Sequence, residues 1–153
     1  MPEVKLVKAD NIFNTIRNML HEGKCVRVTV TGMSMYPFLR EGIDSVLLSD
    51  ISFENLHRGD IALVHNNDGQ YILHRVLRKS GNCIFMAGDS LKEVEGPINS
   101  DSIIAAVTTV WRGDKHIECT NMKWKLLSHV WLLMMPVRSI MLKIIRHIDK
   151  SWA

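Results

Sequence analysis

The sequence predicts a mainly β domain of the α+β class, with a helix near its N-terminus and a helical segment at its C-terminus. Polar and apolar residues alternate strictly over residues 26–31, as in a strand with one buried face. Clusters of turn-forming residues punctuate the middle of the chain, and apolar residues recur at helical spacing near both ends. With 153 residues, 46% of them hydrophobic and 23% charged, the chain is long enough for one domain with its own core.

The first expected element is a helix over residues 10–22. Asp10 or Asn11 can cap its first turn, and Gly23 can end it. The apolar residues of this segment fall on one side of a helix; they are Ile12, Phe13, Ile16, Met19 and Leu20.

About seven short strands are expected in a β core over residues 26–119. The first is the alternating segment 26–31. The others are 45–48, 60–65, 70–77, 83–86, 103–111 and 116–119. Turn signals lie at 66–69, 80–82 and 112–114. The first of these turns is short enough to join its two strands in a hairpin.

Residues 122–153 are expected to form a basic amphipathic helical segment that follows a domain over residues 1–121. Pro136 should kink the helix or begin a second one. The segment carries six Lys or Arg against Asp149 alone, a net charge of +5, which leaves 13 basic and 15 acidic groups in residues 1–121. Such a helix packs on the sheet, contacts a second copy, or lies on a membrane surface through residues 123–150, because Lys and Arg flank a Trp- and Leu-rich face.

Composition excludes several classes of protein. The basic groups are confined to the C-terminal segment, so the stripe that a nucleic-acid-binding domain presents is absent and no nucleic-acid partner is expected. Cys25, Cys83 and Cys119 are odd in number and far apart, which favours reduced thiols in or near the core over disulfides or a zinc site. The first ten residues contain no apolar signal-peptide region, and no apolar stretch reaches the roughly 20 residues that cross a bilayer. We therefore expect a cytoplasmic protein, peripheral at the membrane where it meets one.

Ser34 is the first candidate for chemistry, because it follows the first expected strand in the segment Gly32-Met33-Ser34-Met35-Tyr36-Pro37. A serine hydroxyl is a poor nucleophile near neutral pH, so it needs a neighbouring base and backbone N–H groups for the oxyanion. Gly32 allows close backbone approach to a substrate, and Pro37 fixes the turn. Alone, this pattern is more often a simple turn.

Three further blocks follow Ser34 in a fixed order, at residues 59–64, 71–77 and 85–90. Together the four blocks resemble the boxes of the type I signal peptidase superfamily, which includes the LexA-like self-cleaving repressors (S24/S26). The first box of that superfamily reads Gly-x-Ser-Met-x-Pro, and Gly32, Ser34, Met35 and Pro37 match it. The resemblance covers about residues 26–111. It implies a coiled β-sheet peptidase domain over residues 1–121.

The resemblance implies a catalytic dyad of Ser34 and His74. Many relatives use a lysine as the base, whereas His74 precedes Arg75 and Val76 as in the archaeal and endoplasmic-reticulum branch. A histidine with an ordinary pKa of about 6.5 can act as a neutral base without deep burial. The Gly-Asp box of that branch points to Asp89 as the acid that orients the histidine, with Glu95 in reserve.

Other polar residues near these boxes receive structural roles. Arg75 faces the opposite side of its strand from His74 and is expected to be structural or in an ion pair. Asp60 is assigned to turn geometry. Gly32 stands where many bacterial signal peptidases have a serine that helps to hold the oxyanion, so this site would rely on the Ser34 N–H and other backbone donors. The N-terminal membrane anchor and the helix-turn-helix domain of particular branches are not recognised in the sequence.

The predicted activity is that of a serine endopeptidase that cleaves a leader- or signal-like peptide or a precursor protein, with no cofactor and no metal. The substrate would lie extended as an added strand beside Ser34. Gly32 could bind it through its backbone, and the side chains of Met33, Met35, Tyr36 and Phe38 could line its groove, although each of these could equally belong to the core. A non-catalytic peptide-binding module and a self-cleaving LexA-like regulator remain as alternatives.

Overall fold

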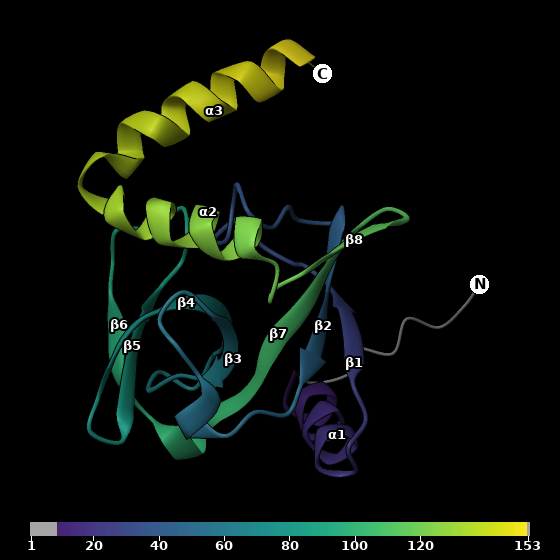
Figure 1. Cartoon of the computed structure of the whole chain (residues 1–153). Helices are drawn as coiled ribbons and strands as arrows, with labels where there is room; N and C mark the ends of the chain where they lie inside the picture. Colours follow the sequence, from purple (N-terminus) through teal and green to yellow (C-terminus); the bar gives the residue numbers. More distant parts are fainter. Residues whose placement is uncertain (1–8, 153) are drawn as a thin grey trace.

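The computed structural model describes residues 9–152, and in that range it contains one eight-stranded antiparallel sheet (Figure 1). The strand order is β1-β2-β7-β3-β4-β5-β6, with β8 paired to β7 outside this path. The strands are β1 (Val26–Thr29), β2 (Asp44–Ser49), β3 (Ile61–His65), β4 (Tyr71–Ser80), β5 (Cys83–Ala87), β6 (Glu95–Asn99), β7 (Ile103–Arg112) and β8 (Lys115–Glu118). The mainly β fold with a helix near one end and helices at the other is confirmed.

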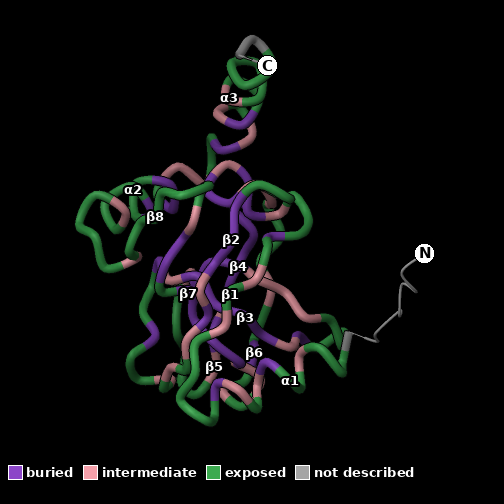
Figure 2. Tube along the Cα trace, turned by 90° about the vertical axis from the view of Figure 1, so that its right-hand side faces the viewer, coloured by how far each residue is buried: buried purple, intermediate pink, exposed green. Residues whose placement is uncertain are grey.

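The sheet is curled, and its residues contribute to two hydrophobic cores. Register shifts interrupt four of the pairings, including β2 with β7 and β4 with β5. Such bulges bend a strand and increase its twist. Leu63 packs in the first core with Leu48, while its neighbour Val64 packs in the second with Ile84. The central strand β3 is therefore buried on both faces, as Figure 2 shows for the interior of the sheet.

The predicted N-terminal helix is α1 (Ala9–His21). Its residues Ile16 and Leu20 are buried in the first core, which is the side that the apolar spacing predicted. Gly23 follows the helix with a φ of +77°, a left-handed conformation that glycine adopts without strain.

The C-terminal segment forms two helices rather than one. They are α2 (Met122–Leu133) and α3 (Arg138–Trp152), joined by the 3₁₀ turn η3 (Met135–Val137) that contains Pro136. The other 3₁₀ turns are η1 (Phe53–Asn55) and η2 (Ser100–Ser102). Asn121 caps α2, because its side-chain oxygen accepts from the Lys123 N–H at 2.9 Å. In Figure 1, α2 lies over the end of the sheet opposite α1, and α3 extends beyond it.

Three details differ from the sequence-based expectations. Strand β6 was not expected, because Gly96 and Pro97 suggest a turn; an edge strand tolerates proline, since its outer N–H groups need no partner in the sheet. Strand β1 ends at Thr29 rather than at residue 31. The prediction that all three thiols lie in or near the core was wrong for Cys25, which is exposed; all three cysteines are free.

Candidate active site

The chain leaves the sheet after β1 and turns through the loop that carries Ser34. Gly32 has a φ of +79°, in the left-handed region that favours glycine. Its N–H donates to a carboxylate oxygen of Glu41 at 3.0 Å. The loop brings the half-buried Ser34 to the end of a cavity between the two halves of the curled sheet.

A second loop, between β5 and β6, fixes the position of Ser34. The Ser90 N–H donates to the Ser34 carbonyl oxygen at 2.9 Å, and the Ser90 hydroxyl donates to the Met33 carbonyl oxygen at 2.8 Å. A Cβ on Gly88 would lie only 2.6 Å from the Ser34 carbonyl oxygen. Glycine at position 88 therefore permits the close contact between the two loops.

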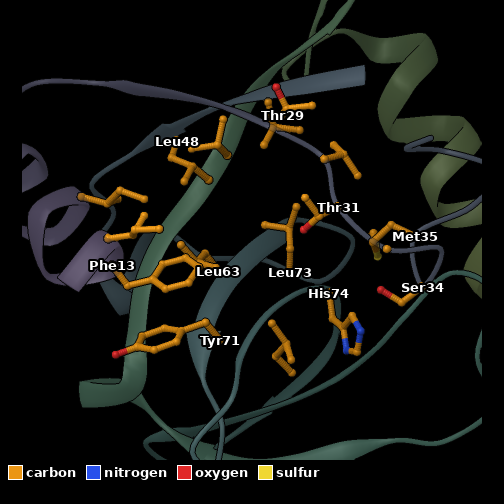
Figure 3. Close-up of a pocket in the computed structure, with 17 residues that line it drawn as sticks. Phe13, Thr29, Thr31, Ser34, Met35, Leu48, Leu63, Tyr71, Leu73 and His74 are labelled. Atoms are coloured by element: carbon orange, nitrogen blue, oxygen red, sulfur yellow. The ribbon is translucent and has the colours of Figure 1, made fainter. Parts of the chain in front are cut away.

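His74 lies on β4, in register with Ala62 of β3, and is only 4% exposed. Figure 3 shows the Ser34 hydroxyl pointing toward the His74 imidazole at the same end of the cavity. Burial lowers the pKa of His74 below its ordinary 6.5, and the carboxylates of Glu95 and Asp89 partly oppose this change. The lowered pKa favours a neutral imidazole near pH 7, the form that can accept a proton.

Two acids lie near His74, and the structure gives them different partners. Glu95 begins β6, and its Oε1 is 3.7 Å from His74 Nδ1. That nitrogen is buried and makes no hydrogen bond within residues 9–152. The separation is longer than a hydrogen bond, and contacts of this kind tighten when substrate binds. The other Glu95 oxygen accepts from the Asn66 side-chain amide at 3.1 Å, which orients the carboxylate.

Asp89 instead forms a buried ion pair with Arg75. Arg75 Nε donates to one Asp89 oxygen at 2.8 Å, and Nη2 donates to the other at 2.7 Å. Both side chains are almost fully excluded from solvent. The ion pair expected of Arg75 is therefore present. It engages both oxygens of Asp89, the carboxylate that was expected to orient His74. Asp89 is thus engaged by Arg75, whereas Glu95 is the acid that faces His74 Nδ1. Asp60, as expected, serves a turn, since it accepts from the His57 N–H at 2.8 Å.

Arg75 also joins the site to the C-terminal helices. Its Nη1 donates to the Gly59 carbonyl oxygen and to the Ser128 hydroxyl of α2, both at 2.9 Å. Its guanidinium lies over the ring of Phe38, 4.4 Å from the centroid. Sequence reasoning missed Ser128, because nothing in an apolar helical run marks one serine as the partner of a distant arginine.

Arg138, at the start of α3, is a second buried cation that sequence reasoning missed. Its Nη1 donates to the carbonyl oxygens of Gly88 and Leu91, each at 3.3 Å. Trp131 of α2 donates its indole N–H to the Asp89 carbonyl oxygen at 3.2 Å. The loop that holds Ser34 is thus itself held by both C-terminal helices. The signal in the sequence that could have identified Arg138 is a charged residue within a run rich in Met, Leu and Ile.

The cavity has a volume of about 330 Å³, and most of the residues that line it are apolar. Leu48, Leu63 and Leu73 line it from three strands. Phe13 of α1 lines its far end and stacks on Tyr71 of β4, with ring centroids 4.0 Å apart. A space of this size accommodates a bulky apolar side chain of a ligand.

The predicted substrate-binding residues divide into two groups. Gly32 and Met35 line the cavity. Met33 is 51% exposed and lies outside this lining. Tyr36 and Phe38 are buried under α2 and α3, where the Tyr36 hydroxyl donates to the Asp149 carboxylate. A substrate contact predicted for Tyr36 does not fit this position, because the side chain packs into the protein.

Within residues 9–152, no three His, Cys, Asp or Glu side chains gather in an arrangement that could hold a metal ion.

Comparison with known families gives one match. A family model described as Peptidase S24-like matches residues 2–107, a span that contains Ser34, His74, Asp89 and Glu95. No curated protein matches the chain at a significant level. The match covers more than half of the chain, so the protein belongs to the Peptidase S24-like family, which confirms the superfamily resemblance noted from the four sequence blocks.

Proposed function

From this family membership and the geometry of the site, we propose that the protein is a serine endopeptidase with Ser34 as nucleophile and His74 as general base. The observation that carries the proposal is the placement of the two side chains at one end of the same cavity, with the pKa of His74 lowered by burial. A hydroxyl beside a neutral imidazole is the arrangement that activates a serine.

Each residue of the site has a defined part in the reaction. Ser34 transfers its proton to His74 as its oxygen attacks the scissile carbonyl carbon, and the leaving amine takes that proton from the imidazolium. Water, with His74 again as base, then hydrolyses the acyl-enzyme. Glu95 stabilises the imidazolium through Nδ1, the nitrogen it faces. The backbone N–H of Ser34 and neighbouring donors bind the oxyanion.

The cavity supports a substrate that is extended and apolar. Leu63 and Leu73 would contact one bulky apolar side chain of the substrate beside the bond that is cut. Leader- and signal-like peptides, which are rich in such residues, fit this requirement, and a precursor protein that carries one is the substrate class that we favour.

The test is cleavage of a pooled library of extended peptides, read by mass spectrometry. Wild type should cleave peptides of the library, whereas Ser34→Ala and His74→Ala should each lose nearly all activity. The double variant should lose no more than either single variant, because the two residues act as a unit. Ser80→Ala, at the exposed end of β4, is the matched serine control and should cut like wild type. A serine-reactive fluorophosphonate should label wild type but not Ser34→Ala.

The alternatives give distinct results in the same experiment. A peptide-binding module would leave the library intact and take no label. A self-cleaving regulator would show a change in its own intact mass that Ser34→Ala abolishes. Cleavage of the library that Ser34→Ala retains would contradict the proposed nucleophile.

A further inference from the structure

The surface of α2 that faces solvent carries several large apolar side chains. Trp131 and Leu132 are buried on its inner side. On the outer side, Leu126, Val130 and Leu133 recur at intervals of one helical turn, and Leu126 and Leu133 are 67% and 74% exposed. A helix on the surface of a globular protein normally presents polar residues outward, and a helix that is apolar all round is normally enclosed on every side. The outer side of α2 therefore carries an apolar stripe, with Lys123 and Lys125 exposed on the same helix.

The adjoining helix α3 also exposes apolar residues and adds positive charge. Its buried side carries Leu142, whereas Ile140 and Ile144 are exposed one turn apart. Lys143 lies exposed next to Ile144, and Lys150 is exposed about two turns further along the same side of the helix. The acid of this helix, Asp149, accepts from the Tyr36 hydroxyl. The exposed surface thus combines an apolar stripe with a basic stripe.

The bend between the two helices is fixed to the domain. Arg138, buried at the bend, donates to carbonyl oxygens of the Gly88–Leu91 loop. Within the described residues no single helix is long and apolar enough to cross a membrane. The pair of α2 and α3, bent by 65° at the break between them, has the length and composition of a span only when the two helices are taken together. The bonds of Arg138 favour a pair whose inner side is held against the loops around Ser34 and whose outer side lies along a surface.

We propose that the outer face of α2 and α3 docks on an anionic lipid bilayer and lies in the plane of its interface. This outer face consists of Leu126, Val130, Leu133, Ile140 and Ile144, with Lys143 and Lys150 beside them. Apolar side chains enter the boundary between headgroups and acyl chains, and the lysines bind anionic headgroups. A second copy of the chain is a poorer occupant, because each copy brings a C-terminal segment of net charge +5 to the contact.

The experiment measures co-sedimentation of the full chain with vesicles of phosphatidylcholine alone or mixed with phosphatidylglycerol. Wild type should bind the mixed vesicles and be released at high salt. Lys143→Gln combined with Lys150→Gln should weaken binding by about tenfold or more, since each cation near an anionic surface contributes about fivefold. Lys24→Gln combined with Arg78→Gln, which removes two exposed cations elsewhere, is the charge-matched control and should bind like wild type.

The apolar part of the surface is tested in the same way. Leu126→Ser combined with Leu133→Ser should abolish binding, whereas Leu126→Met combined with Leu133→Met should retain it. Thermal unfolding should be unchanged in each variant, because these side chains contact solvent. Absence of wild-type binding, binding that ignores the lysine substitutions, or binding that survives high salt would overturn the proposal. A dimer that Leu126→Ser with Leu133→Ser dissociates, without vesicle binding, would assign the surface to a second copy instead.

Discussion

The two acids near His74 allow a sharp test, because the same chemical change at each should have opposite consequences. Asp89→Asn removes the charge that balances Arg75, and both side chains are essentially 0–1% exposed. Leaving a buried charge without its partner costs about 3–5 kcal/mol. In a chain of this size that corresponds to a fall in Tm of about 6–20 °C.

Glu95→Gln should leave stability almost unchanged. Its carboxylate is 30% exposed and stands 3.7 Å from His74, so the contact resembles a surface pair worth about 0–1 kcal/mol. The expected change in Tm is about 0–4 °C. Its effect falls on catalysis, because the imidazolium loses the carboxylate that stabilises it in the transition state.

Thermal unfolding by circular dichroism gives both Tm values, and peptide cleavage below the lower Tm gives both rates. Asp89→Asn should unfold early and retain most of its kcat while folded, whereas Glu95→Gln should be stable and slow. Arg75→Met combined with Asp89→Leu should recover much of the lost stability, because an apolar pair needs no charge balance. If Asp89→Asn keeps the wild-type Tm and loses cleavage, Asp89 is the catalytic acid and the assignment of Glu95 fails.

Three further predictions concern the same site. Activity should fall as His74 becomes protonated, and because burial lowers the pKa of His74, the acid limb of the kcat/KM profile should lie below pH 6.5. Glu95→Gln removes a group that raises this pKa, so the acid limb should move to still lower pH. An acid limb that does not move would exclude Glu95 as the acid beside His74. Gly88→Ala places a Cβ 2.6 Å from the Ser34 carbonyl oxygen, and the displaced nucleophile should lower kcat/KM by about 100-fold, measured beside Ser80→Ala as control. Leu73→Trp should fill the cavity and reduce cleavage of peptides with a bulky apolar residue beside the cut more than of peptides with alanine there, as competition between the paired peptides would show.

Local pattern was sufficient to predict most of the sheet. The alternation at residues 26–31 identified β1, and the turn at 66–69 identified the hairpin of β3 and β4, where the Asn66 side chain accepts from the N–H groups of Asp68 and Gln70. Strand β6 was not predicted, because its assignment depends on its place at the edge of the sheet. Only there does Pro97 cost no hydrogen bond, and the position of a strand within a sheet is not a local property.

The candidate site was likewise predictable from sequence only in part. Ser34 and His74 could be proposed from sequence because each stands at a fixed place in a sequence block, and the structure places both in the lining of one cavity. The choice between the two acids could not be made from sequence, because Asp89 and Glu95 are both close to the strands that bear on His74, and the assignment of Glu95 stays a prediction. What separates them is the alternation of β4, which directs His74 and Arg75 to opposite sides, and the pairing of Glu95 with Met86 across a register shift. The first is readable from sequence, whereas the second requires the folded sheet.

The C-terminal helices lie beyond the family match, yet they are bonded to the parts of the site that position the nucleophile. Ser128 accepts from Arg75, Arg138 holds the loop that contacts Ser34, and Asp149 accepts from Tyr36, two residues after Ser34. Each of these bonds joins the inner side of the helix pair to the loops around Ser34, and the proposed lipid contact is on the outer side of the same pair. A change in the position of α3 on a membrane would therefore act on the Ser34 loop directly. This argues that the helices support the candidate site and do not form a separate appendage.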